Sequence, residues 1–301
     1  MSNEITAVLE KLDHILLDKK NAVRLSVACL LARGHLLLED LPGMGKTTLA
    51  SAIAGLLGLE YRRVQFTSDM LPADLIGMSI FDKERGDFTF KRGPLFSQIL
   101  LADEINRGSS RTQSALLEAM AEYQVSVDKE TYALPRPFFV IATQNPQDQS
   151  GTFVLPESEL DRFTMRIEIG YPSREAERQM LLGMQHQVEG SILDTRQLLD
   201  MQEQCDRVQV SENALGYLLD LVTATRTCGK IPNPLSPRAS RALLSCSRAW
   251  AYLKGRDYLL PDDIQAVFPY VAEHRMRSGT GTLGSGNSLS RMIIDSVDPV
   301  R

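Results

Sequence analysis

One short stretch, LLLEDLPGMGKTTLA at residues 36–50, constrains the fold more than any other part of the chain. A short apolar run that fits a buried strand leads into a glycine-containing loop, and an apolar helical pattern follows Lys46. Strand, loop and helix in this order form a phosphate-binding P-loop, because the backbone N–H groups at a helix N-terminus attract phosphate. The stretch therefore predicts a nucleotide site in an α/β fold.

The loop departs from the usual spacing G-x-x-x-x-G-K-[ST] at one position, because Asp40 stands where the first glycine is expected. That position mainly ends the strand, so we expect the exception to leave the phosphate site intact. Gly43 and Gly45 would allow the tight curl of the loop, and Pro42 would stiffen it. The alternative is an ordinary surface turn with a solvated lysine.

The residues after the loop have the chemistry that a nucleoside triphosphate requires. Lys46 would reach the β- and γ-phosphates, and Thr47 would offer its hydroxyl to Mg²⁺. We therefore expect ATP and Mg²⁺ as cofactors. The residues predicted to bind the nucleotide are Pro42, Gly43, Met44, Gly45, Lys46, Thr47 and Thr48.

Polar residues also end two later apolar strands. Asp103 and Glu104 follow ILLA, and Asn145 follows FFVIATQ. Because parallel strands end at one edge of a sheet, these side chains would lie beside the P-loop. We expect Asp103 to hold Mg²⁺, Glu104 to deprotonate the attacking water, and Asn145 to place that water. On its own, an Asn after a strand is more often a turn residue.

The order of elements predicts two domains. Buried strands alternate with helical patterns as far as Tyr171, which indicates a doubly wound, mostly parallel five-stranded sheet over residues 1–171. Alternating residues near 76–92 predict a hairpin insert. Helical patterns dominate residues 172–301, which predicts a smaller all-α domain, with a Gly/Ser loop at 278–288.

Composition argues against several classes of function. The net charge of −5 and the lack of a long basic tract give no reason to expect a general nucleic-acid binder. The four cysteines lie far apart and the histidines have no ligand spacing, so neither disulfides nor a zinc site is expected. The N-terminus lacks signal-peptide features, and no apolar segment reaches the roughly 18–20 residues of a membrane span. We therefore expect a cytoplasmic protein.

Several motifs occur together in a distinctive order: EDLPGMGKTTLA, LLADEINR with RTQSALLEAMAEYQV, VIATQNP, SGTFVLPESELDRF and SPRAS. From about residue 22 to the C-terminus, the chain resembles the MoxR family of AAA+ ATPases. The resemblance implies an AAA+ P-loop core, a helical lid, and hexameric rings that hydrolyse ATP at subunit interfaces. By matching motifs, Arg162 corresponds to the arginine finger and Arg238 to the sensor 2 arginine of the lid. The hairpin at 76–92 resembles an insertion that faces the pore.

The favoured hypothesis is a Mg²⁺-dependent ATPase that remodels or matures partner proteins. The resemblance implies partners that carry von Willebrand factor A domains. The main alternative is a nucleic-acid-associated AAA+ motor or loader. A nucleotide-gated binding module with little turnover and a small-molecule kinase are further alternatives.

Other interpretations of single residues stay open. Arg162 could pair with Glu159, Arg107 could make a local ion pair or contact a neighbouring subunit, and only one of Arg238 and Arg241 is expected to reach nucleotide. The chain also reads ILLDKKNAV where the family usually has a Gly-Gln pair near the adenine.

Overall fold

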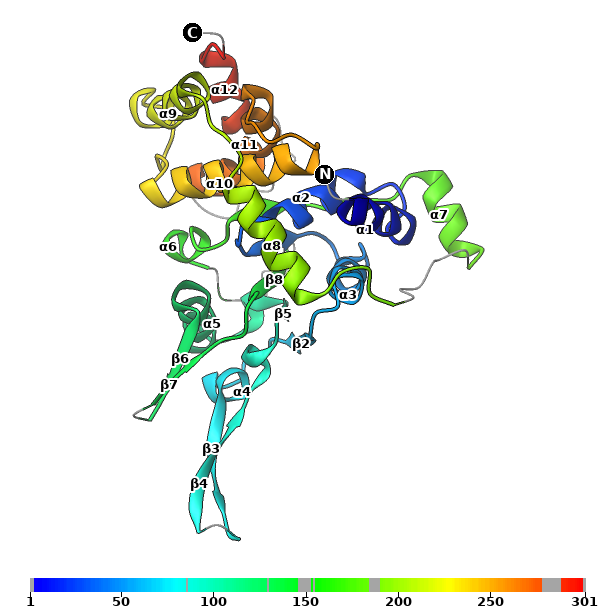
Figure 1. The fold of residues 1–301 in the computed structure, drawn as a ribbon. Coiled ribbons are helices and arrows are strands. Elements are labelled where there is room, and N and C mark those ends of the chain that lie inside the picture. The colour runs from blue at the N-terminus through cyan, green and yellow to red at the C-terminus, as the bar shows by residue number, and fades with distance from the viewer. Residues whose placement is uncertain are drawn as a thin grey trace.

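The computed structural model describes residues 3–84, 86–128, 130–145, 153, 155–183, 190–277 and 288–299. Within these residues, a five-stranded sheet with the strand order β2-β5-β8-β1-β9 lies at the centre of the core (Figure 1). Every pair of neighbouring strands is parallel, which confirms the predicted α/β class. In spatial order the strands are Tyr61–Gln65 (β2), Ile99–Asp103 (β5), Phe139–Gln144 (β8), Leu36–Glu39 (β1) and Met165–Ile167 (β9).

The three central strands are buried along their whole length. This burial explains their continuous apolar sequences, because helices cover both faces of a parallel sheet. Leu36 and Leu38 of β1 pack in the cluster formed with the N-terminal helices, whereas Leu37 packs on the opposite face with residues of α5. The helices around the sheet are α1 (Asn3–Ile15), α2 (Lys20–Leu31), α3 (Lys46–Leu56) and α5 (Ser110–Glu122).

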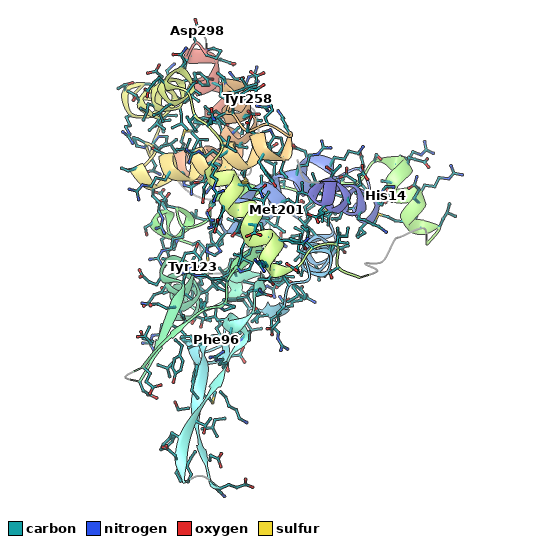
Figure 2. The ribbon with its side chains drawn as sticks, in the orientation of Figure 1. His14, Phe96, Tyr123, Met201, Tyr258 and Asp298 are labelled. Atoms are coloured by element: carbon teal, nitrogen blue, oxygen red, sulfur yellow. The ribbon has the colours of Figure 1, made fainter. Side chains whose placement is uncertain are left out.

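Two hairpins extend away from the sheet, and the first contains the insert predicted near 76–92 (Figure 1). The Phe90 ring of the first stacks on the Tyr132 ring of the second, with centroids 4.4 Å apart, and Ser79 Oγ donates to Asp128 Oδ2 at 3.0 Å. Phe96 lies at the base of the first hairpin (Figure 2). The elements of this region are α4 (Pro72–Ile76), β3 (Gly77–Asp82), β4 (Asp87–Arg92), a 3₁₀ turn (Pro94–Phe96), β6 (Gln124–Val127) and β7 (Glu130–Ala133).

Helices make up the rest of the described chain after β9. Ser173 and Ser211 cap helix N-termini and Pro261 is the first residue of a helix, as the sequence indicates. Of the predicted loop at 278–288, residues 278–287 lie outside the described residues. The helices are α7 (Arg174–Leu181), α8 (Thr195–Asp206), α9 (Glu212–Thr227), α10 (Pro237–Leu253), α11 (Pro261–Met276) and α12 (Leu289–Ser296).

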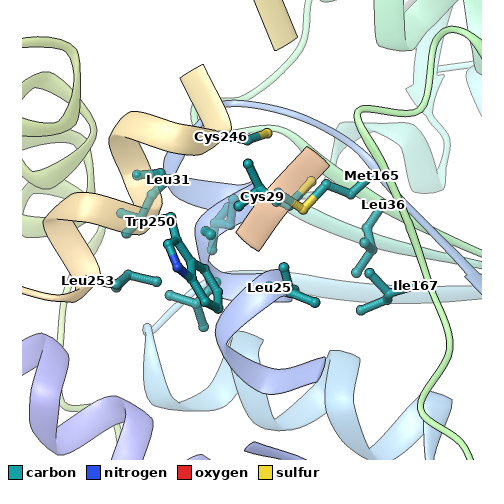
Figure 3. Packing of buried hydrophobic residues seen from close by; sticks show 14 of the residues in the cluster. Leu25, Cys29, Leu31, Leu36, Met165, Ile167, Cys246, Trp250 and Leu253 are labelled. Carbon is teal, nitrogen blue, oxygen red and sulfur yellow. The ribbon is translucent and has the colours of Figure 1, made fainter. Parts of the chain in front are cut away.

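Among its described residues, the helical part does not have a hydrophobic core separate from that of the sheet domain. Trp250 and Cys246 of α10 are buried in one cluster with Leu25 and Cys29 of α2, and Figure 3 shows these side chains together. The cluster continues to Met165 of β9. Thus α10 packs firmly on the sheet domain, and the boundary at Tyr171 stays a prediction.

The cysteines are free thiols, as expected, and Cys29, Cys205 and Cys246 are buried. Burial raises the pKa of the Cys246 thiol to about 12, which makes it chemically inert. In the described parts of the chain, no helix combines the length and the apolar character that a bilayer span requires.

Candidate active site

The predicted P-loop joins β1 to α3, and its backbone is shaped by two glycines. Gly43 and Gly45 have φ angles of 82° and 90°, in the left-handed region that favours glycine. Gly45 immediately precedes α3, whose first residue is Lys46. Pro42, Thr47 and Thr48 are exposed, and Met44 is half-buried. The loop thus presents the N-terminus of an eleven-residue helix to solvent, which is the arrangement that attracts phosphate.

Asp40 has a structural role that explains its presence in the loop. Its Oδ2 atom accepts hydrogen bonds from the backbone N–H groups of Ile169 and Gly170, both at 2.7 Å. Lys19 Nζ donates to the carbonyl oxygen of the same Gly170 at 2.8 Å. The carboxylate therefore ties the end of β1 to the segment that leads into α7.

Lys46 lies among acidic groups. Its Nζ atom donates to the Asp40 carbonyl oxygen at 2.6 Å. Burial lowers the pKa of Lys46, and the charges of Asp40, Asp103 and Glu104 act in the opposite direction. The predicted phosphate-binding lysine, the predicted metal ligand Asp103 and the predicted general base Glu104 are therefore close together.

Thr143 links these two acids, a role that sequence reasoning did not identify. Its hydroxyl donates to Asp103 Oδ1 at 2.5 Å and accepts from the Glu104 backbone N–H at 2.9 Å. Glu104 adopts φ 54°, in the left-handed region, immediately after β5. The only sequence feature that could have indicated this role is the position of Thr143 in IATQN, two residues before Asn145.

Both acids are also paired with arginines. Arg63 donates to Asp103 Oδ2 from Nε at 3.1 Å and from Nη2 at 2.6 Å. Arg107, in the 3₁₀ turn Ile105–Arg107, contacts Glu104 with 2.8 Å between Nε and Oε2. Of the two interpretations of Arg107, the structure thus contains the local ion pair. Sequence reasoning did not identify Arg63.

Asn145 directly follows β8, the strand between β5 and β1. It therefore lies at the same carboxyl edge of the sheet as Asp103 and the P-loop. Its role in placing water stays a prediction.

A small pocket opens beside the P-loop. Its walls are largely apolar, and only its loop residues were predicted from the sequence. The lining residues are Ile15, Leu16, Leu17, Lys19, Gly43, Met44, Gly45, Thr48, Pro172 and Met180. If the loop bound the phosphates of a nucleotide, the planar nucleobase would pack against these walls.

Arg162 and Arg238 lie away from this site. Arg162 follows α6 (Glu157–Leu160) and precedes β9, whose first residue pairs with Leu36 at the amino end of β1. Figure 1 shows α6 and the amino-terminal end of α10 on one side of the sheet, opposite α1, α3 and α7. The charge of Arg238 acts on the buried His35, also at the amino end of β1. The structure does not bring either arginine to the chain's own P-loop.

The segment that carries Arg162 is fixed to the helical part. Arg275 of α11 pairs with Asp161, with 2.7 Å between Nε and Oδ1, and donates to the Phe163 carbonyl oxygen. Ser236, the N-cap of α10, donates to Asp161 at 3.4 Å. No ion pair between Arg162 and Glu159 occurs among the described residues. The segment of Arg162 and the start of α10, which carries the exposed Arg238, are thus joined by the hydrogen bond between Ser236 and Asp161.

Comparison with known proteins agrees with this geometry. The profile of the ATPase family associated with various cellular activities matches residues 35–165, and an AAA lid domain profile matches residues 223–288. Chaperone MoxR1 of Mycobacterium tuberculosis is 38% identical over 87% of this chain and 73% of its own length. The chain belongs to the MoxR family of AAA+ ATPases.

Two other similarities extend over nearly the whole chain. The uncharacterized protein YeaC of Bacillus subtilis is 42% identical over 89% of this chain and 85% of its own length. A crystal structure of a protein assigned as an ATPase, from Cytophaga hutchinsonii, superposes with a TM-score of 0.87 at 35% identity, covering 97% of this chain and 93% of that one. The MoxR resemblance and the AAA+ core with its helical lid are thereby confirmed.

Proposed function

We propose that this chain hydrolyses ATP with Mg²⁺ and uses the energy to remodel or mature partner proteins. The observation that carries the proposal is the Thr143 hydroxyl, which joins Asp103 and Glu104 at the edge of the sheet beside Lys46. Thr143 holds both acids in fixed positions. This suits a site in which one acid binds a metal ion and the other deprotonates a water molecule.

The residues present fit ATP and Mg²⁺. The N–H groups at the start of α3 and the Lys46 ammonium would bind the phosphates, while the apolar pocket beside the loop would take the base. Thr47 and Asp103 would hold Mg²⁺, since hydroxyl and carboxylate oxygens are the ligands that it prefers. When bound, Mg²⁺ would neutralise charge on the phosphates.

Glu104 would act as the general base. Its carboxylate would take a proton from water as the water oxygen bonds to the γ-phosphorus and the bond to the β-phosphate oxygen breaks. Arg107 now neutralises this carboxylate, so hydrolysis would require that ion pair to loosen. Asn145 would orient the same water.

We further propose that the arginines act across a subunit interface. Arg162 and Arg238 lie at the end of the sheet opposite the P-loop, so a head-to-tail neighbour could supply them to the γ-phosphate. A closed hexameric ring, which the family membership supports, would give each P-loop such a neighbour.

Mixed assemblies test this arrangement. Arg162→Ala should bind ATP normally but lose about 10³- to 10⁵-fold in turnover, the contribution of an arginine supplied in trans to P-loop enzymes. Lys46→Ala should be inactive because it does not bind ATP. Mixing the two should restore phosphate release where an intact P-loop meets an intact Arg162. Arg178→Ala, on the exposed helix α7, is the matched control and should retain full activity.

Two results would contradict the trans assignment. One is an active Arg162→Ala protein. The other is a mixture that remains inactive although mass spectrometry detects mixed rings.

The proposed partners are proteins that carry von Willebrand factor A domains. Membership of the MoxR family and the name Chaperone MoxR1 of one relative support a protein client. The tip of the first hairpin offers a surface for a client, since Phe81 and Phe88 are 51% and 67% exposed. The buried free thiols support a reducing compartment such as the cytoplasm. ATP hydrolysis stimulated by DNA would instead favour the nucleic-acid motor.

A further inference from the structure

The contact between Arg63 and Asp103 joins two neighbouring strands at the proposed metal site. In the β2–β5 register Arg63 lies opposite Leu101, so its side chain extends along the strand to reach Asp103. The Arg63 side chain is 49% exposed, whereas the Asp103 side chain is 13% exposed. Arg63 Nη2 also donates to Gln65 Oε1 at 3.3 Å. The Arg63 guanidinium is thus held by both Asp103 and Gln65.

These contacts occupy most of the hydrogen-bond acceptor positions of the Asp103 carboxylate. Its Oδ2 atom accepts two N–H groups from Arg63, and its Oδ1 atom accepts the Thr143 hydroxyl. A carboxylate has about four acceptor directions in all. One direction therefore remains, on Oδ1, and the negative charge is already compensated by a fixed cation.

We propose that Arg63 is a positioning residue that holds Asp103 and competes with a divalent cation for its charge. Mg²⁺ dehydrates reluctantly and needs strong oxygen ligands, so a carboxylate shared with a guanidinium would bind it weakly. The phosphates of ATP supply the missing negative charge. As a result, the nucleotide-free chain would bind a divalent cation weakly at Asp103 because of Arg63. The inference rests on the assignment of Asp103 to Mg²⁺ in the proposed function.

Metal binding in the absence of nucleotide tests this competition directly. Mn²⁺ is the probe, and the paramagnetic resonance signal of free Mn²⁺ is measured in titrations of the full chain after removal of nucleotide. Arg63→Met should bind Mn²⁺ about three- to tenfold more tightly than the unmodified chain, as expected for loss of a partly exposed, charge-assisted pair. Adding Asp103→Asn to the same variant should abolish the gain.

Arg62→Met is the matched control. Arg62 is the adjacent residue of β2, is 64% exposed, and pairs with Glu60 at 3.4 Å rather than with Asp103. The substitution changes the net charge by the same amount, so it should leave Mn²⁺ affinity within about twofold. An equal gain in both variants would assign the effect to overall charge and overturn the proposal.

Two further variants keep the test decisive if Arg63→Met fails to fold. Arg63→Gln retains hydrogen-bond donors on β2 without the charge, and should also bind Mn²⁺ more tightly. Arg63→Lys keeps the charge, and should bind Mn²⁺ nearly as weakly as the unmodified chain. If Arg63→Gln is folded by circular dichroism and binds Mn²⁺ no more tightly, the competition does not exist.

Failure of the proposed function would look different. If calorimetry detects no ATP binding to the unmodified chain, the nucleotide assignment is wrong whatever the Mn²⁺ titrations give. If ATP binds and Mn²⁺ affinity does not respond to Arg63, only the competition is wrong.

Discussion

Substituting Asp40 by glycine would restore the usual P-loop spacing, yet we expect Asp40→Gly to damage the protein. The substitution removes the acceptor of the Ile169 and Gly170 N–H groups. It also removes the acceptor of the Leu41 N–H, at 3.0 Å from Oδ1. The segment between β9 and α7 would then lose its connection to the end of β1.

The magnitude follows from the two 2.7 Å bonds. A hydrogen bond to a charged acceptor contributes about 1.5–3 kcal/mol, so two would total about 3–6 kcal/mol. Asp40 is half-buried, and water can replace part of this interaction, which reduces the expected loss to about 2–4 kcal/mol. Glycine adds about 0.5–1 kcal/mol through its greater freedom in the unfolded chain.

Urea unfolding and hydrogen exchange together measure the effect. The free energy of unfolding should fall in Asp40→Gly, and the Ile169 and Gly170 amides should exchange faster than amides in the centre of the sheet. Asp40→Ala controls for the freedom of glycine and should lose slightly less stability. Asp40→Asn keeps one oxygen acceptor and should lose about half as much. Unfolding energy and exchange rates equal to those of the unmodified chain would refute the structural role of this carboxylate.

Three other predictions concern the site and the buried histidine. Lys46→Ala should lose ATP affinity in calorimetry, because the cation that compensates phosphate charge is gone; unchanged affinity would contradict the P-loop assignment. Glu104→Gln should bind ATP but release phosphate about 10²- to 10⁴-fold more slowly, and near-normal turnover would place the base elsewhere. Burial lowers the pKa of His35 to about 4, so the unfolded chain takes up the proton first, and stability should fall as pH drops from about 6.5 to 4. The loss attributable to His35 at pH 5 should be about 2 kcal/mol, and unfolding curves of His35→Leu should show a correspondingly weaker pH dependence.

The geometry around His35 explains the direction of that last effect. Its Nδ1 atom accepts from the Val140 N–H at 3.1 Å, while Nε2 lies 3.2 Å from the Met120 carbonyl oxygen. This arrangement suits the neutral ring with its proton on Nε2. Protonation would turn Nδ1 into a donor that faces another donor.

The parts of the site that could be predicted from sequence are those built by short stretches of chain. The strand, loop and helix around Lys46 are contiguous, and so are Asp103 and Glu104 at the end of β5. In such stretches the order of residues fixes which groups are close together. The α/β class followed equally well, because buried parallel strands have continuous apolar sequences.

The contacts that were missed join strands far apart in the sequence. Asp103 meets Arg63 and Thr143, each 40 residues away, only because β2 and β8 flank β5 in the sheet. The order of the strands in the sheet had not been derived from the sequence. Neither contact could therefore be predicted. Asp40 was interpreted as the end of a strand for the same reason, since its partner Gly170 is 130 residues away.

The positions of Arg162 and Arg238 favour an assembly over a self-sufficient monomer. The family resemblance predicts that Arg162 and Arg238 act on a nucleotide, and the fold indicates which chain's nucleotide they could approach. In the fold, β1 separates them from the P-loop, with the arginines near its amino end and the loop at its carboxyl end. Arg275 and Ser236 hold Asp161, the residue before Arg162, so the Arg162 segment would have to break these contacts to move across the sheet. A self-sufficient monomer would require that movement, whereas a head-to-tail assembly requires only that the two ends of neighbouring chains meet. The rigid support of the Arg162 segment therefore favours assembly as the route to a complete site.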